Sequence, residues 1–162
     1  MTITYLGHSC FSLESKEYKV ILDPYQPDSV PGYRPLHEEA ERVLCSHDHR
    51  DHSGTDCVTL GRGGEDPFTV TTLSTWHDDV QGAKRGPDTI HILDDGQCRV
   101  AHLGDLGCDL TAGQKDQLRG LDALLIPVGG FYTIDARQAK ALADELKPRV
   151  VIPMHYRGEG FG

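Results

Sequence analysis

Short runs rich in β-branched, aromatic and other apolar residues, separated by turn residues, dominate the first hundred residues. Runs of this length and composition are typical of β-strands, and their close spacing favours hairpins and meanders. The predicted strands are ITYLG from Ile3, CFSLE from Cys10, YKVILD from Tyr18, RVLCS from Arg42, FTVTTLST from Phe68, DTIHIL from Asp88 and CRVAHLG from Cys98.

Two later runs are almost continuously apolar. They are DALLIPVG from Asp122 and RVVIPMH from Arg149. An unbroken apolar run is expected where a strand is covered on both faces, so both strands are predicted to be buried.

One helix is predicted between these two strands, and the sequence marks its ends. Asp135 and Gln138 form a capping pair, as Thr111 and Gln114 do at a second helix start, and Pro148 follows the end. The apolar residues share one helical face: Ala136, Ala139, Leu142, Ala143 and Leu146. A βαβ-like unit from 122 to 153 after a strand-rich first half predicts a mixed α/β fold.

Length and charge narrow the functional classes. The 162 residues, 38% of them hydrophobic, suit one domain spanning 1–162. A net charge of -9 opposes non-specific binding to nucleic acid or anionic membranes, so neither is expected as a partner. The chain shows no leader peptide or membrane-spanning run, and its five cysteines form no CxxC pair. We therefore expect a soluble cytoplasmic protein.

The chemistry concentrates in the segment HDHRDH, which directly follows the apolar run 43–45. His47, His49, Asp51 and His52 place three imidazoles and a carboxylate within six residues. A bare HxH often belongs to a solvated loop, but this cluster at the end of a buried strand indicates a metal site for Zn, Mn or Fe. The first two histidines can hold one ion, and the adjacent Asp and His can face a second.

Four ligands do not complete two metal sites, so further donors are needed downstream. His77, Asp105 and His155 each stand at the downstream end of an apolar strand. Open α/β folds usually keep their functional residues at such strand ends. Their shared placement predicts that they join the HDHRDH segment.

These residues resemble the signature of the metallo-β-lactamase superfamily, HxHxDH. Six further motifs look like those of the branch that includes ascorbate-6-phosphate lactonase and many uncharacterised bacterial hydrolases. They are GHSCF, LDPY, HDDxxGxxRG, HLGD, LIPVGGFYTID and VIPMHY. The resemblance runs from about Ile3 to Tyr156 and implies an αββα sandwich with metals at one edge. Relatives usually continue beyond PMHY, whereas this chain stops at Gly162. Either a C-terminal segment is lacking, or part of the pocket wall comes from elsewhere.

The resemblance also implies a ligand set and a reaction. It assigns His47, His49 and His77 to one divalent ion, Asp51, His52 and His155 to a second, and Asp105 to a bridge between them. Zn is the first expectation, with Mn or Fe as alternatives. Two divalent ions carry four positive charges, and the negative charges of Asp51, Asp105 and a bridging hydroxide would leave the centre about one unit positive. Such a centre suits a small anionic lactone, ester or amide as substrate.

Four further residues have two readings each. Asp23 either orients a metal-bound imidazole or forms the turn before Pro24. His8 and His102 either line the pocket and donate protons or are ordinary hydrogen-bonded histidines. Arg85 either grips an anionic substrate or is a solvated loop residue.

Three rival functions remain to be weighed. A phosphodiesterase or nuclease shares this ligand order, although the acidic charge opposes a nucleic-acid substrate. An oxygen-reducing di-iron protein usually has Glu where this chain has His49. A metal-stabilised binding module needs only four closed ligands, fewer than the seven present. The sequence allows a homo-oligomer but does not fix the oligomeric state.

Overall fold

A four-stranded sheet forms the first half of the fold in the computed structural model, which describes residues 1–61 and 63–160. Strands β1 (Thr2–Gly7), β2 (Cys10–Ser15) and β3 (Tyr18–Leu22) form an antiparallel meander. Strand β5 (Arg42–Leu44) joins β3 in parallel and delivers the chain to the HDHRDH segment. The predicted meander is confirmed, with a parallel strand at its edge.

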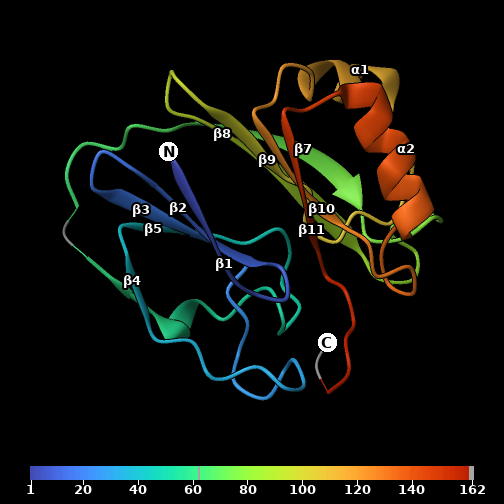
Figure 1. The fold of residues 1–162 in the computed structure, drawn as a ribbon. Coiled ribbons are helices and arrows are strands. Elements are labelled where there is room, and N and C mark those ends of the chain that lie inside the picture. The colour runs from blue at the N-terminus through green and yellow to red at the C-terminus, as the bar shows by residue number, and fades with distance from the viewer. Residues whose placement is uncertain (62, 161–162) are drawn as a thin grey trace.

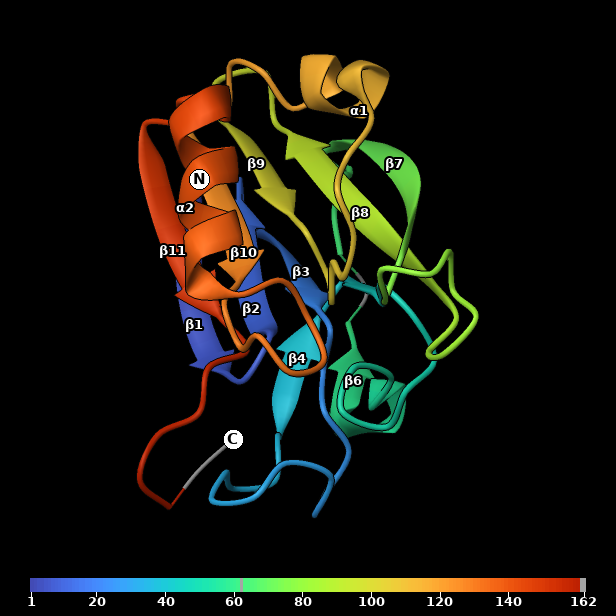
Figure 2. The ribbon, with the colours of Figure 1, turned by 90° about the vertical axis from the view of Figure 1, so that its right-hand side faces the viewer.

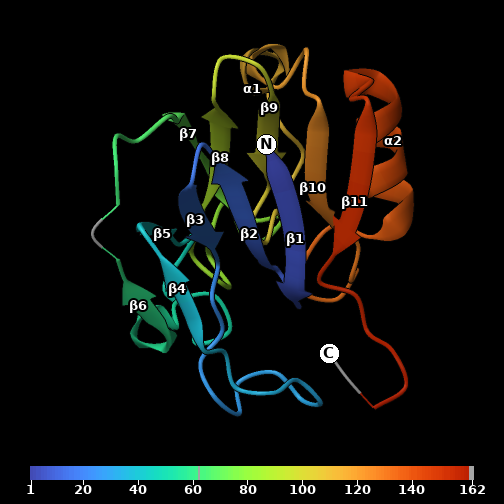
Figure 3. The ribbon, with the colours of Figure 1, turned by 60° about the vertical axis from the view of Figure 1, so that its left-hand side comes forward.

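The second sheet has five strands in the order β11-β10-β9-β8-β7. β7 (Thr69–Trp76), β8 (Pro87–Asp94) and β9 (Arg99–His102) are antiparallel neighbours. β10 (Ala123–Pro127) pairs in parallel with both β9 and β11 (Val150–Met154). In Figure 3 the four-stranded sheet lies in front of this sheet. The mixture of parallel and antiparallel strands confirms the α/β class.

Both helices begin where the capping pairs predict. α1 (Ala112–Gln117) follows Thr111 and α2 (Ala136–Leu146) follows Asp135, and each start has a complete capping box. The helices cover the outer face of the five-stranded sheet (Figures 1 and 2). Leu146 and Ala139 anchor α2 in the core between the helices and that sheet.

Three apolar layers hold the elements together. Between the two sheets, Phe11 and Val20 of one pack with Leu125 and Met154 of the other. Outside the four-stranded sheet, Ile21 packs under the segment 25–60. That segment carries the short strands β4 (Glu38–Ala40) and β6 (Val58–Leu60) and the 3₁₀ turn Thr55–Cys57. In the described residues this outer layer contains no α-helix, whereas the expected sandwich has helices on both sides.

One strand differs from its prediction. β10 is buried throughout, as its apolar run indicates. β11 was expected to be covered on both faces, but it is the edge strand of the sheet, and Val150 and Val151 are 52% and 44% exposed. An apolar run does not reveal whether a strand lies at the centre or the edge of a sheet.

Two further expectations concern membrane-spanning helices and the ends of the domain. Among the described residues, no helix is long and apolar enough to span a membrane. The prediction about the chain end at Gly162 lies outside the described residues, and the single-domain boundary 1–162 stays a prediction.

Because β10 is buried and β11 lies at the sheet edge, we expect side-chain truncation in β10 to lower the free energy of unfolding more than truncation in β11. Leu124 is wholly buried and pairs in register with the half-exposed Val151. We expect Leu124→Ala to lower the free energy of unfolding by about 2–5 kcal/mol, because it leaves a cavity in the core. Val151→Ala should cost below about 1 kcal/mol. Denaturant unfolding with chelator present measures both, and equal losses would contradict the burial pattern.

Candidate metal centre

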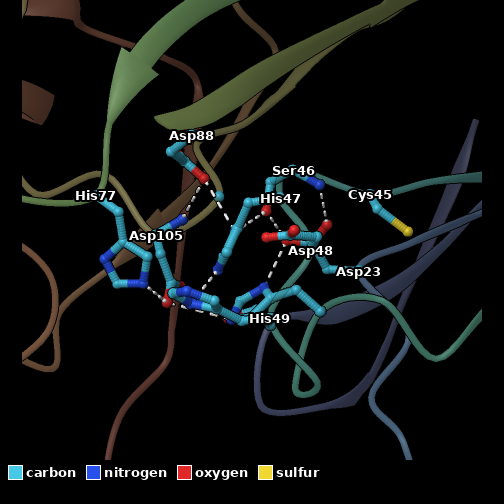
Figure 4. Close-up of polar contacts among 12 residues, drawn as sticks. Asp23, Cys45, Ser46, His47, Asp48, His49, His77, Asp88 and Asp105 are labelled. Atoms are coloured by element: carbon cyan, nitrogen blue, oxygen red, sulfur yellow. Dashed lines mark hydrogen bonds and ion pairs between the residues drawn. The ribbon is translucent and has the colours of Figure 1, made fainter. Parts of the chain in front are cut away.

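The first donor group lies where the HDHRDH loop meets the end of β7. His47, His49 and His77 place one nitrogen each within 4.8 Å of one another. His47 Nε2 is 3.1 Å from His49 Nδ1, and His77 is the first residue after β7. Figure 4 shows these imidazoles turned toward a common centre, although β7 and the loop belong to different sheets.

The second donor group lies beside the first. His8, Asp51, His52 and His155 also place one ligand atom each within 4.8 Å of one another. His155 follows β11 directly and His8 follows β1, so the group draws on both sheets. The resemblance assigns three of these residues to one ion; His8 is the additional member.

Asp105 lies between the two groups. Its Oδ2 atom is 3.0 Å from His77 Nε2, which belongs to the first group. The same oxygen is 3.2 Å from His52 Nε2 and 3.2 Å from His155 Nε2, which belong to the second. The structure therefore brings all seven predicted donors together, with Asp105 in the position expected of a bridge.

The polar atoms at this centre fit a cation. Asp105 Oδ1 is buried and makes no hydrogen bond within the described chain, and the buried His52 Nε2 has ion-pair contacts with Asp51 and Asp105 but no hydrogen bond. Such buried polar atoms are costly unless another ligand satisfies them. Burial raises the pKa of Asp105, but the charges of His52 and His155 outweigh burial and hold that pKa well below its usual value. A divalent ion between imidazole and carboxylate ligands would satisfy the same atoms.

Asp23 and Ser46 connect the two donor groups from behind. Asp23 Oδ2 lies 2.8 Å from His52 Nδ1, and both Ser46 N and Ser46 Oγ donate to the Asp23 carboxylate at 2.6 Å. The Ser46 hydroxyl has its one proton committed to Asp23, so it accepts from His47 Nδ1 at 2.9 Å. One buried carboxylate thus orients an imidazole in each group.

Two supporting carboxylates were missed by the sequence reasoning. Asp88 Oδ1 lies 3.3 Å from His47 Nδ1 and accepts from the backbone N–H of Asp105 at 3.1 Å. Asp78 accepts four backbone N–H groups from the loop 80–85, at 2.8–2.9 Å. Asp88 stands at the start of an apolar run and Asp78 directly follows His77, which were the only sequence signals for them.

Two other predicted residues, His102 and Arg85, lie outside the two donor groups. His102 is wholly buried; its Nδ1 accepts from Gly104 N, and its Nε2 lies 2.8 Å from Ser9 O. These contacts favour the alternative of an ordinary hydrogen-bonded histidine, and Nδ1 also lies 3.9 Å from Asp23 Oδ2. Arg85 is half-buried and lines a cavity beside His49 and His77.

Backbone strain collects at the centre. His8, Asp23 and His155 have φ values of 56°, 45° and 51°, a left-handed conformation that non-glycine residues seldom adopt. A Cβ atom on Gly129 would lie 2.5 Å from the backbone oxygen of His155, so only glycine fits there. Strain of this kind persists where the surrounding structure enforces it, commonly at functional sites.

The Ser46 contact predicts an effect on metal affinity. Ser46→Ala leaves His47 Nδ1 without the hydroxyl that orients it, so we expect metal to bind about 10–100-fold more weakly. Ser46→Thr, which keeps the hydroxyl, and Ser74→Ala, on the exposed side of β7, should bind as the wild type does. Competition with a chromophoric chelator measures all three, and undiminished affinity in Ser46→Ala would refute the role of Ser46.

Asp23 predicts a pH dependence of stability in metal-free protein. Burial alone would raise its pKa, but His102, His52 and Ser46 lower it to about 2. A depressed carboxyl pKa stabilises the fold above the unfolded pKa of about 4, and that stability is lost as pH falls toward 2. Asp23→Asn should therefore cost about 2 kcal/mol at pH 7 and progressively less below pH 4. Denaturant unfolding across this range checks it; a pH-independent difference would contradict it.

Comparison with known proteins agrees with this arrangement. Residues 2–155 match the family model described as a beta-lactamase superfamily domain. A UPF0173 protein of Pyrococcus abyssi is 32% identical over 100% of this chain and 86% of its own length. A UPF0173 metal-dependent hydrolase of Carboxydothermus hydrogenoformans is 28% identical over 96% of this chain and 84% of its own.

A solved structure agrees as well. A Thermotoga maritima protein of the metallo-β-lactamase superfamily superposes with a TM-score of 0.74 and 33% identity, covering 97% of this chain and 76% of that protein. None of these three relatives is named a lactonase, so the narrower resemblance to ascorbate-6-phosphate lactonase stays a prediction. The chain belongs to the metallo-β-lactamase superfamily and is a metal-dependent hydrolase.

Proposed function

We propose that this hydrolase cleaves a small anionic lactone, ester or amide with water activated between two divalent ions. The observation that carries the proposal is the position of Asp105, whose Oδ2 atom lies within 3.0–3.2 Å of imidazoles from both donor groups. A single structural ion needs four closed ligands and no such bridge. The mixed nitrogen and oxygen donors favour Zn, with Mn or Fe as alternatives.

The proposed ligand sets follow the two donor groups. His47, His49 and His77 would hold one ion, Asp51, His52 and His155 would hold the other, and the Asp105 carboxylate would contact both. His8 Nε2 lies 3.3 Å from Asp51 Oδ2, so His8 supports that carboxylate from the cavity side. When bound, such ions would lower the pKa of a water ligand and stabilise negative charge on the attacked group.

The protein side chains orient this chemistry. Asp23 fixes His52 directly and His47 through Ser46, while Asp88 fixes His47 and the backbone of Asp105. Hydrolysis adds one water across the bond: its oxygen goes to the acyl carbon, and its protons are shared between the acid formed and the alcohol or amine released. The chain has no GxSxG motif, which argues against a serine nucleophile.

The free cysteines and the comparison with relatives bear on the compartment of this enzyme and on the rival functions. All five cysteines are free, as expected in a reducing compartment, so we propose a cytoplasmic enzyme acting on a small molecule. The phosphodiesterase or nuclease reading remains the second candidate because both reactions use the same donor order. The binding-module reading is disfavoured because a relative over most of its length is named a metal-dependent hydrolase.

Replacement of the proposed bridge tests the two-ion centre. Asp105→Asn keeps the size of the side chain but removes its charge, so we expect kcat to fall by about 10²-fold or more and metal content to drop from two ions per chain toward one. Asp109→Asn, on the exposed end of the same loop, should retain both. Wild-type turnover and metal content in Asp105→Asn would exclude Asp105 as the bridge.

A substrate panel separates the candidate reactions. Metal-loaded protein should hydrolyse anionic lactones or esters, lose this activity with chelator and regain it when metal is returned. Turnover of bis(4-nitrophenyl) phosphate without turnover of any lactone, ester or amide would favour the phosphodiesterase reading instead.

A further inference from the structure

Two hollows meet over the metal centre and share the residues His8, Tyr132 and Arg157. The first, of about 520 Å³, is also lined by His49, His77 and Arg85. The second, of about 400 Å³, is also lined by Phe131, His155 and Tyr156. Both have the size of small-molecule sites. The first hollow touches both donor groups, whereas the second touches only His8 and His155 of the second group, so one ligand can lie across the centre with its two ends in different surroundings.

The first hollow is cationic although the chain carries a net charge of -9. Arg50, Arg85 and Arg157 line it from three separate segments, against one acidic residue outside the proposed ligands, Asp28. A local surplus of positive charge in a cleft attracts anions that the whole surface would repel. We call Arg50, Arg85 and Arg157 the arginine cluster.

Two of these guanidinium groups are already positioned. Arg85 lies over the Tyr132 ring, 5.1 Å from its centroid, and donates to Phe131 O at 3.4 Å. Arg50 Nε donates to Gln26 Oε1 at 3.1 Å. Since each guanidinium has five N–H donors in a planar fork, further N–H groups are available for a carboxylate or phosphate. Positioned donors lose little entropy when an anion binds.

The second hollow presents aromatic surface instead. Phe131 is 76% exposed and Tyr132 is 51% exposed, and their rings meet edge to face 4.7 Å apart. Tyr156 also lines this hollow, next to His155 in the sequence. Exposed aromatic side chains beside a cavity commonly contact an apolar part of a ligand.

The two hollows together suit a ligand that has both an anionic group and an apolar part. On the basis of the proposed function, we infer that the substrate is an amphiphilic acid. Its carboxylate or phosphate group binds the arginine cluster, its apolar or aromatic body lies on Phe131 and Tyr156, and the bond to be hydrolysed lies between them over the metal centre. Arg85 also connects the two hollows, because it packs on Tyr132 and donates to the carbonyl of Phe131.

Binding of non-hydrolysable probes tests this inference without turnover. Calorimetry on metal-loaded protein compares phenylphosphonate with methylphosphonate. We expect Arg85→Gln and Arg50→Gln to weaken both probes by about tenfold, through loss of charge-assisted hydrogen bonds. Phe131→Ala should weaken phenylphosphonate about tenfold and leave methylphosphonate unchanged. Arg119→Gln and Leu60→Ala, exposed and remote from both hollows, are the matched controls.

Kinetics with paired esters provide the second measurement. The KM for 4-nitrophenyl hydrogen succinate should rise about tenfold in Arg85→Gln, while the KM for its neutral methyl ester stays unchanged. Unchanged probe affinities in both arginine variants would overturn the inference even if esters are hydrolysed. Loss of probe binding in these variants, with no ester, lactone or amide hydrolysed by wild type, would preserve the anion site and overturn the proposed function.

Discussion

The contact between one buried carboxylate and imidazoles from both sheets is the constraint on which the site depends. Asp105 is 1% exposed, and its Oδ2 atom meets His77 directly after β7, His155 directly after β11 and His52 from the loop after β5. Bringing these side chains to one oxygen requires the two sheets to pack in a fixed relation. The core between the sheets therefore positions the chemistry as well as stabilising the fold.

Much of this arrangement could be predicted because the relevant signals are local in sequence. HDHRDH follows an apolar strand, and His77, Asp105 and His155 stand at or just beyond the ends of three others, so strand recognition alone brings them toward one edge. The capping residue Asp135 likewise marked the start of α2 because a cap is read from neighbouring positions. The seven donors meet for these reasons, while the resemblance supplied their division between two ions.

The features that could not be predicted from the sequence depend on packing between segments that are distant along the chain. The exposure of Val151 follows from the position of β11 at the sheet edge, and His102 is buried beside Asp23, which directly follows β3 of the other sheet. Asp88 reaches His47 only because β8 lies beside the loop that leaves the other sheet. The surroundings of Arg85 are set in the same way, by the 131–132 turn across the cavity. No local pattern encodes these relations.

Anomalous X-ray diffraction from crystals of the metal-loaded protein tests the central claim most directly. The account predicts two metal peaks about 3.5–4 Å apart. One should be coordinated by His47, His49 and His77 and the other by Asp51, His52 and His155, with the Asp105 carboxylate contacting both. A single fully occupied ion, or two ions with no contact to Asp105, would contradict it.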